Sequence, residues 1–499
     1  MTSKKQFLKS GMMLACVALL MRSISLAFNA YITDRVGAEG MGLLSLTMSV
    51  YGFAVTFATA GVALAVTRLV ASALGRAEGE RARRVLRAAV IYALAFGGTA
   101  AVCLYFGSHF IAVRLLSDIR TRASLRLLSI SLVPIALSAV YSGYFIAVRR
   151  VVHNAATQVF EQCVRILLTF GGLMLAGENV ELACLALVGG SSVSEFFSFF
   201  LLFLQARIDL SRHRLSGGDT GGEGRAVFGY AFPCAVSAQL RSGLLTVQHL
   251  LIPYALTLGG AMRGEALASY AALHSMALPV VLFPTAILAS FSGLLVPECA
   301  ELDGVGDTAR LGRLSRKALF GALVFASLSA ALIFVGADTL GVLIYDSDDA
   351  SRYIKMLAPL VPVMYMDSVV DAHLKGLGYQ VYSMGVNIVD AAASVLGVLL
   401  FLPRFGADGY ILVIYITELL NFALSLGKLV RLVRLPRSVR FWTVAPLCAI
   451  FSVFVASLFM RGEGLLHMIL CFLAVLGAYT AFLFSFTKKK NAPFADFEI

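Results

Sequence analysis

The stretch LACVALLMRSISLAF, residues 14–28, is apolar enough to lie in lipid and yet carries Arg22 at its centre. A charge inside a membrane span is costly, so such residues usually face the protein interior or a cavity. A secretory signal peptide would end its apolar segment after about 7–15 residues at a small-residue cleavage site. Here the apolar run that follows Lys9 continues to Tyr31. The stretch therefore predicts a retained first membrane helix, in which Arg22 either reaches back to water or faces a partner inside the protein.

The composition of the whole chain is that of a membrane protein. Hydrophobic residues make up 59% of the 499 residues, charged residues make up 14%, and the mean hydropathy is +0.84. Soluble domains have roughly 45–50% apolar and about 25% charged residues. No stretch between the apolar runs is long enough to form a soluble domain. The eight cysteines are scattered without a C-x-x-C pair, so neither a disulfide framework nor a zinc site is indicated.

The number of membrane spans follows from the length of the apolar windows. A helix that crosses a bilayer needs roughly 20 mainly apolar residues, and about fourteen such windows follow one another along the chain. The sequence therefore predicts an all-α integral membrane protein. The predicted spans are 9–32, 41–70, 85–107, 125–148, 155–177, 182–206, 228–257, 265–297, 317–337, 353–376, 381–402, 409–430, 441–460 and 464–487.

Basic residues predict the orientation, because Lys and Arg gather on the cytoplasmic side of membrane proteins. With the N-terminus inside, most of the 41 Lys and Arg residues fall in cytoplasmic segments. Both termini are then cytoplasmic, the first with Lys4 and the last with Lys488. The positive charge lies against the anionic lipids of the cytoplasmic leaflet. This pattern accounts for the net charge of +12 without nucleic-acid binding.

One group of arginines departs from this pattern. Arg114, Arg120, Arg122 and Arg126 cluster in a connection that is predicted to lie outside. A surface helix at the membrane would place such side chains in the headgroup region. We therefore expect a short helix lying on the outer surface there.

Two halves of the chain resemble each other. The segment that begins at Pro134 and the segment that begins at Pro362 both consist of a span, a short basic turn and a span with an acidic residue. The acidic residue is Glu161 in the first segment and Asp390 in the second. An alternative remains open, which is that any two apolar hairpins look alike.

The repeat predicts two six-helix lobes that insert the same way round, related by a pseudo-twofold axis along the membrane normal. Transporters built from such halves bind their substrate between them. A Gly-rich and charged segment separates the halves, as expected of a linker. The predicted organisation is an N-terminal lobe (1–206), a cytoplasmic linker (207–227), a C-terminal lobe (228–432), and two additional helices with a basic tail (433–499).

Polar residues form stripes on the helices that open the two halves. Arg22, Ser25 and Asn29 share one face of the first span, and Arg241 and Gln248 share one face of the seventh. Arginine suits phosphate because its planar fork donates two parallel hydrogen bonds and stays charged. The stripes therefore predict a cleft that binds an anion such as a pyrophosphate.

Arg68, near the end of the second span, is a further candidate for this cleft. The alternative for all three arginines is that they reach back to the membrane surface. Arg68 is the residue to which this alternative applies most readily, because it lies close to the cytoplasmic end of its span.

Other charges within spans have simpler expected roles. Glu161 and Arg165 are four residues apart and are expected to form a structural ion pair. Asp367 and Asp371 are also four apart but repel each other, so one of them is expected to take up a proton or a sodium ion. Pairing with a basic residue such as Lys375 is the alternative. Because no hydrolase, metalloprotease or ATP-binding motif is found, we expect no enzyme activity, cofactor or metal.

Three segments resemble a known family. They are AYITDRVGAEGMGLLSLTMSVYGFAVTFATAGVALAVTRLVAS (30–72), SGYFIAVRRVVHNAATQVFEQCVRI (142–166) and HLKGLGYQVYSMGVNIVDAAASV (373–395). Together with the span count they make the chain similar to the polysaccharide exporters typified by stage V sporulation protein B. This family belongs to the MOP superfamily, with the lipid II flippases and the MATE drug antiporters.

The resemblance implies a fold and a function. The fold is a V-shaped pair of six-helix lobes around a central cavity, with two extra helices in fourteen-span members. The function is the flipping of undecaprenyl-pyrophosphate-linked oligosaccharides or peptidoglycan precursors across the cytoplasmic membrane. Lipid II flippases line their cavity with arginines, and the spans that carry Arg22, Arg68 and Arg241 are comparable.

The prediction is therefore a monomeric, multi-pass flippase of the cytoplasmic membrane that works by alternating access. Its partners are a lipid-linked oligosaccharide with a pyrophosphate headgroup and the anionic membrane lipids. A proton gradient, a sodium gradient or the membrane potential resets the lobes. The main alternative is a MATE-type exporter of cationic drugs, whose cavity should be acidic and aromatic. A membrane glycosyltransferase would need a large outside loop, which the sequence lacks.

Overall fold

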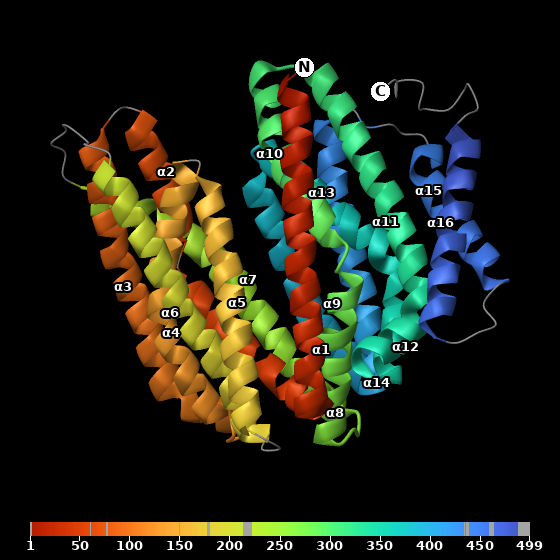
Figure 1. Cartoon of the computed structure of the whole chain (residues 1–499), viewed down its shortest axis with the longest axis horizontal. Coiled ribbons are helices and arrows are strands. Elements are labelled where there is room, and N and C mark those ends of the chain that lie inside the picture. The colour runs from red at the N-terminus through yellow and green to blue at the C-terminus, as the bar shows by residue number, and fades with distance from the viewer. Residues whose placement is uncertain are drawn as a thin grey trace. The chain divides into compact units, whose positions relative to one another are not determined.

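The structure is a computed structural model in which the described part of the chain is helical and contains no strand (Figure 1). The described residues are 2–59, 61–75, 78–148, 150–176, 180–212, 222–433, 435, 439–458 and 464–487. The middle of the predicted linker and the basic tail from Lys488 lie outside them. The all-α fold class is confirmed.

The helices form two compact units, and unit 2 consists of residues 35–253. Within it α3 packs on α4, and α4 and α5 both pack on α6. Its elements are the second part of α1 (Thr2–Thr59), α2 (Val62–Gly75), α3 (Gly79–Phe110), the π-helical turn η1 (Ile111–Leu115), α4 (Thr121–Ala147), α5 (Val151–Ala176), α6 (Val180–Arg212) and most of α7 (Glu223–Leu258).

Unit 1 consists of residues 1–34 and 254–499. It contains the first part of α1 and a series of elements that follow α7. These are α8 (Arg263–Ala271), η2 (Ala272–Ala277), α9 (Leu278–Val281), α10 (Thr285–Val305), α11 (Thr308–Tyr345), α12 (Asp348–Leu357), η3 (Ala358–Leu360), α13 (Val361–Gly376), α14 (Gln380–Leu432), α15 (Val439–Ser457) and α16 (Leu465–Thr487).

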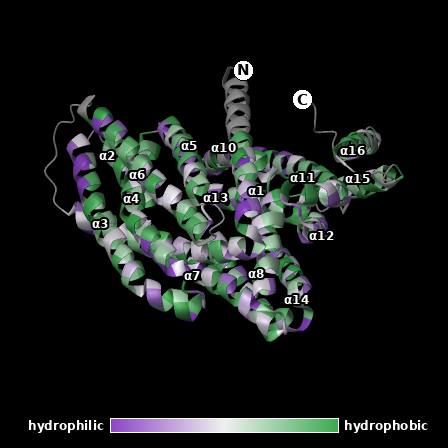
Figure 2. Cartoon of the chain, turned by 60° about the horizontal axis from the view of Figure 1, so that its bottom comes forward, coloured by the Kyte–Doolittle hydropathy of each residue, from purple (hydrophilic) through white to green (hydrophobic). Residues whose placement is uncertain are grey.

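Many of the helices are apolar enough to cross a membrane. Among the described residues, ten helices are long and hydrophobic enough, or up to eleven when the bent pair 263–281 and 285–292 is taken as one span. Two of the ten, Ala18–Leu74 and Gln380–Leu432, contain 57 and 53 residues, more than twice the roughly 20 that one crossing needs. Figure 2 shows hydrophobic residues predominating along the helices. The chain is therefore a multi-pass membrane protein, whereas the number of fourteen spans stays a prediction.

Glycines mark the turns inside the two longest helices. Gly37 in α1 has φ 74° and Gly406 in α14 has φ 59°, values that favour residues without a side chain. The sequence predicts a connection at each of these places. A 53-residue helix without a turn would be far longer than the bilayer is thick.

The units do not follow the order of the chain. Residues 1–34 belong to the unit that contains α8 to α16, and most of α7 belongs to the unit that contains α2 to α6. Side-chain hydrogen bonds join α7 to the second part of α1, from Thr246 Oγ1 to the Ser49 carbonyl oxygen at 3.2 Å and from Thr56 Oγ1 to Ser242 at 3.2 Å. The predicted division into lobes at 206 and 228 stays a prediction.

The connection after α3 contains no separate surface helix. The chain leaves α3 through η1 and enters α4 at Thr121, after a turn in which Ser117 has φ 50°. The Asp118 carboxylate accepts hydrogen bonds from the backbone and side chain of Arg120, which holds this turn in place. The expected short helix is therefore replaced by a π-helical extension of α3.

The last two helices pack on α11. Val335 on α11, Cys448 on α15 and Cys471 on α16 belong to one buried cluster. The hydroxyl of Tyr479, which is buried in this cluster, donates to the Val324 carbonyl oxygen at 2.9 Å. Helices α15 and α16 are therefore an integral part of unit 1.

Candidate functional site

The polar stripe of the first span faces a broken helix within unit 1. Arg22 Nη1 donates to Thr285 Oγ1 at 3.3 Å, and Asn29 Nδ2 donates to the Ser275 carbonyl oxygen at 2.6 Å. Asn29 Nδ2 also lies 3.4 Å from the Tyr345 hydroxyl. Ser25, the third residue of the stripe, is exposed. The stripe thus joins α1 to the π-helical turn η2 and to the start of α10.

The helix that receives these contacts is irregular for identifiable reasons. It bends by 59° between 263–281 and 285–292, and Pro279 and Pro284 lie at the bend. Proline lacks a backbone N–H and so frees a carbonyl group from the helical pattern. Broken helices in membranes occur where protein groups or water satisfy the freed backbone. Asn29 satisfies one carbonyl in the π-helical turn of this segment.

Arg22 is half-buried, and its hydrogen bond to Thr285 leaves most of its N–H donors unused. Within the described residues it makes no ion pair. The guanidinium group is thus positioned at a helix break, where no acidic side chain of the described residues neutralises it. An anion could therefore bind to it through the remaining donors.

The other predicted binding residues lie in unit 2. The Arg68 guanidinium on α2 stacks over the Tyr230 ring on α7, with Cζ 4.6 Å from the ring centroid. Arg241 is exposed on α7, and the described part of the chain offers it no hydrogen bond or ion pair. Gln248, two turns further along α7, is buried. Three predicted residues therefore lie on α1 in unit 1 and three on α2 and α7 in unit 2.

A triad of charges lies within unit 2. Arg165 Nη2 is 2.5 Å from Glu161 Oε1 on the same helix and 3.4 Å from Glu195 Oε1 on α6. Arg165 Nε also lies 3.4 Å from the Ser194 hydroxyl. Sequence reasoning left Glu195 without a role. The residue lies 30 positions from Arg165, so no helical spacing connects the two.

Acidic residues also come together within unit 1. Asp371 pairs with Lys375 Nζ at 2.6 Å and accepts a hydrogen bond from the Ser383 hydroxyl. Asp367 lies one turn earlier on α13 and acts electrostatically on Glu418, as does Asp390. The sequence singled out Asp367 and Asp371. Their neighbours Asp390 and Glu418, both on α14, were not connected with them because they lie on later spans.

Taken together, the apolar helices, the broken span and the arginines within spans define a multi-pass membrane protein of the transporter type. The chain belongs to the polysaccharide biosynthesis protein family, whose model matches residues 7–291, more than half of the sequence. The resemblance predicted from the three sequence segments is thereby confirmed.

Comparisons with individual proteins agree with this family. The chain is 24% identical over 424 residues to stage V sporulation protein B of Bacillus subtilis (strain 168), covering 83% of this chain and 81% of that protein. It is 19% identical over 380 residues to sporulation protein YkvU of the same organism, covering 75% and 83%.

Solved structures share the fold. The lipid II flippase MurJ in an inward closed conformation superposes with a TM-score of 0.73 at 14% identity, covering 96% of this chain and 98% of that one. An inward-facing multidrug resistance MATE family transporter of the MOP superfamily gives a TM-score of 0.64 at 14% identity, covering 84% and 98%. The chain therefore shares its fold with these two transporters.

Proposed function

We propose that this protein flips a lipid-linked oligosaccharide or peptidoglycan precursor across the cytoplasmic membrane. The observation that carries the proposal is the position of Arg22, a half-buried arginine within a candidate span. It donates a hydrogen bond to Thr285 at a helix break, and most of its N–H donors remain unused. A pyrophosphate headgroup supplies the acceptors that such a guanidinium lacks. The name of the similar solved protein, a lipid II flippase, supports this substrate class.

In the proposed mechanism, arginines bind the diphosphate while the polyprenyl tail stays in lipid. Arg22, Arg68 and Arg241 are the proposed phosphate ligands, and Ser25, Asn29 and Gln248 add hydrogen bonds. Arg68 is held by the Tyr230 ring, which limits its motion before a ligand arrives. The bend near Pro284 gives unit 1 a place at which a helix can change its angle. Alternating access then exposes the headgroup first inside and then outside.

Resetting the empty protein is proposed to involve the acidic residues of α13. Asp367 and Asp371 are the candidate groups for a proton or a sodium ion. Asp371 already has Lys375 as a partner, with Nζ at 2.6 Å. Asp367 lies within electrostatic reach of Glu418 on α14, and two neighbouring carboxylates favour the binding of a cation.

The same acidic residues support a second candidate function, a MATE-type exporter coupled to cations. The likeness to MATE structures concerns the fold. Arg22, Arg68 and Arg241 argue against it, because they would repel a cationic drug. Resistance to cationic drugs in an export-deficient host that expresses this chain would favour this second function over flipping.

The proposed function is tested by removing the arginines. In proteoliposomes with a fluorescent pyrophosphate-linked lipid, Arg22→Ala and Arg241→Ala should each lower the flipping rate roughly tenfold or more, since hydrogen bonds to charged groups are strong. Arg22→Lys, which keeps the charge but loses the fork, should retain part of the rate. Arg114→Ala, which removes an exposed arginine in η1, is the matched control. Unchanged flipping by folded Arg22→Ala protein would refute the proposal.

The cellular placement is part of the same proposal. We propose a monomer in the cytoplasmic membrane with both termini inside. A single cysteine at residue 78 should then react with an impermeant thiol reagent only from the inside. A single cysteine at residue 118 should react only from the outside. Labelling of both from the same side would overturn the proposed orientation.

A further inference from the structure

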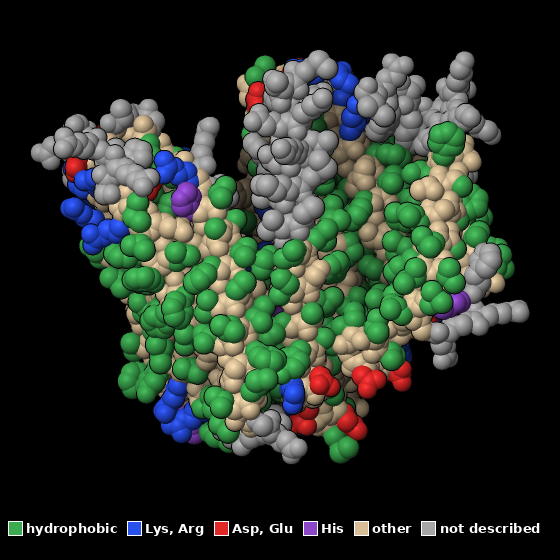
Figure 3. All heavy atoms as spheres, in the orientation of Figure 1, with side chains coloured by type: hydrophobic (Ala, Val, Ile, Leu, Met, Phe, Trp, Pro, Cys, Tyr) green, Lys and Arg blue, Asp and Glu red, His purple; other side chains and the backbone are tan. Residues whose placement is uncertain are grey.

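The arginines at the lower end of unit 2 remain outside the proposed transport mechanism. Lys and Arg side chains gather at this end of the unit in Figure 3. The arginines are Arg114, Arg120, Arg122 and Arg126, in the connection from α3 to α4 and the first turns of α4. The charge pattern predicts this end to lie outside, where basic residues do not help to set the orientation. Their presence there needs another physical explanation.

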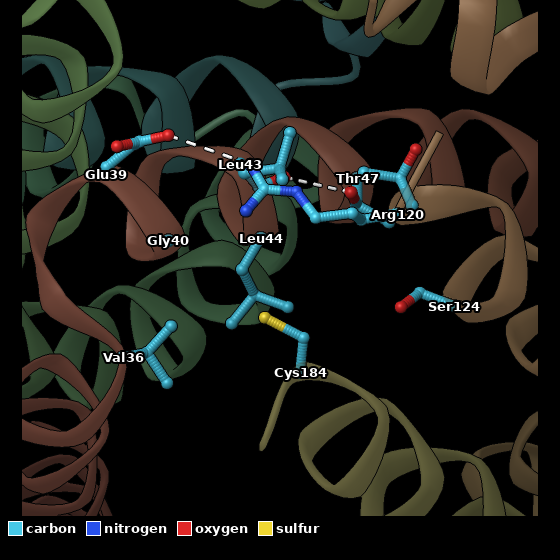
Figure 4. A pocket seen from close by; sticks show the side chains of 10 residues that line it. Val36, Glu39, Gly40, Leu43, Leu44, Thr47, Arg120, Ser124 and Cys184 are labelled. Atoms are coloured by element: carbon cyan, nitrogen blue, oxygen red, sulfur yellow. Dashed lines mark hydrogen bonds and ion pairs between the residues drawn. The ribbon is translucent and has the colours of Figure 1, made fainter. Parts of the chain in front are cut away.

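One of these arginines is neutralised by its neighbours. The Arg120 guanidinium binds the Asp118 carboxylate, with Nη2 at 2.6 Å from Oδ2. It also lies 3.7 Å from Glu39, toward which it points in Figure 4. The hydrogen bonds with Asp118 raise the pKa of the Arg120 guanidinium. Arg120 lines a cavity of 150 Å³ together with Thr47, Cys184 and other residues of unit 2. Its charge is satisfied within the protein.

Two other arginines are not neutralised. Arg126 lies over the Tyr105 ring, with Cζ 5.1 Å from the centroid, and donates to the Ser108 hydroxyl at 3.3 Å. The Arg122 Nε is buried and makes no hydrogen bond within the described part of the chain. Neither arginine has a carboxylate partner among the described residues. A buried donor without an acceptor costs free energy unless a ligand supplies one.

Both arginines line one shallow cavity, which is open to the surroundings and has an apolar side. The cavity measures 620 Å³ and is bordered by Tyr105, Ile119 and Ile130 as well as by Arg122 and Arg126. Ile119 and Ile130 are 55% and 52% exposed. A small inorganic anion would satisfy the arginines and leave these side chains uncovered. A ligand with both an anionic group and hydrocarbon chains would cover them as well.

We propose that this cavity binds the phosphate of an anionic phospholipid headgroup in the outer leaflet. Arg122 and Arg126 donate to the phosphate oxygens, and the first methylene groups of the lipid chains lie on Ile119 and Ile130. Tyr105 keeps the Arg126 guanidinium in place by its ring contact. The assignment to the outer leaflet rests on the orientation proposed above. The site itself shares no residue with the proposed transport site, so lipid binding is tested independently of flipping.

The inference is tested by lipid binding to the full-length protein. Purified protein in neutral detergent micelles is titrated with phosphatidylglycerol or phosphatidylcholine, and bound lipid is counted by native mass spectrometry. Phosphatidylglycerol should bind more tightly than phosphatidylcholine. Each of Arg122→Gln and Arg126→Gln should weaken phosphatidylglycerol binding about fivefold, the effect of one basic residue near an anionic lipid surface.

Two further variants distinguish specific binding in the cavity from nonspecific attraction of the lipid to surface charge. Arg114→Gln removes an equal charge from the same segment but outside the cavity lining, so binding should change less than twofold. Ile130→Trp keeps both arginines and fills the apolar side, so binding should weaken. If Arg114→Gln weakened binding as much as Arg122→Gln, or if Ile130→Trp left it unchanged, the inference would be wrong.

Inorganic phosphate distinguishes the two sources of the anion. It should not displace phosphatidylglycerol at the concentration at which the lipid half-saturates the protein. Equal competition would identify a site for free anions and overturn the assignment to a lipid. Circular dichroism and gel filtration of each variant establish that the protein is folded before binding is compared.

Discussion

Arg165 lies between two carboxylates, and its removal should show how a charge within a membrane span is tolerated. In Arg165→Met, Glu161 and Glu195 would face each other without a cation. Because an uncompensated charge in a buried pair is strongly destabilising, we expect a loss of roughly 2–3 kcal/mol in the free energy of unfolding. Unfolding in mixed detergent micelles measures this change.

The control for this variant restores electrical balance without the arginine. A triple variant with Arg165→Met, Glu161→Gln and Glu195→Gln has no charge in the triad, so most of the lost stability should return. If the triple variant is as unstable as Arg165→Met alone, the loss comes from packing of the arginine side chain instead of from charge.

The candidate residues on α1 show what one sequence can and cannot reveal. A polar stripe at helical spacing predicts that Arg22 and Asn29 share a face, because that spacing depends only on the helix itself. It does not identify Thr285 and Ser275 as their partners, which lie about 250 positions away in the fold. Glu195 was missed for the same reason.

Between elements, close approach of α2 and α4 depends on Gly143. A Cβ atom at this position would lie 2.6 Å from the Ala63 carbonyl oxygen, closer than such atoms can approach. Thr67 Oγ1 on α2 donates to the Gly143 carbonyl oxygen at 3.0 Å. Small residues at such crossings let membrane helices approach closely. Gly143→Ala should therefore force α2 and α4 apart and cost about 1–3 kcal/mol of stability.

A matched glycine lies on α5. Gly171 has no atom within 4 Å of the position of an added Cβ, so Gly171→Ala should be tolerated and should even favour the helix slightly. Thermal unfolding of the two variants in the same detergent compares them directly. Equal stability of Gly143→Ala and Gly171→Ala would show that the helix crossing is not tight.

Element boundaries were predictable where local chemistry determines them. The turns at Gly37 and Gly406 fall in connections that span length and hydropathy predict. The π-helical turns 111–115 and 272–277 were not predicted, because they arise from contacts of the surrounding helices and leave no periodic pattern in the sequence.

At the scale of the whole molecule, hydropathy along the chain does not indicate which helices form a compact unit. The first span groups with residues 254–499 because its polar stripe contacts the broken helix. Hydropathy gives the length of a span and the side on which it begins, but not the neighbours of the span. Repeats in sequence therefore constrain the number of helices more than their grouping.

The last prediction concerns the energy source of the whole transport cycle. A pyrophosphate-linked lipid carries negative charge outward, and each elementary charge gains about 2.3 kcal/mol when it moves with a membrane potential of 100 mV. This gain depends only on the net charge moved per cycle and not on which step carries it. An inside-negative potential should therefore drive outward flipping, with an accumulation ratio of up to roughly fiftyfold per charge at 100 mV.

Proteoliposomes with a potassium gradient and valinomycin set this potential, and a fluorescent pyrophosphate-linked lipid reports its distribution between the leaflets. Reversing the gradient should reverse the direction of accumulation. The variant Asp367→Asn distinguishes the two energy sources. If the charge of the substrate alone drives transport, the effect of the potential should be unchanged in this variant. If a cation is carried as well, the variant should accumulate less substrate. If accumulation did not change with the potential in either the wild type or Asp367→Asn, no net negative charge would cross the membrane. That result is incompatible with flipping of a pyrophosphate.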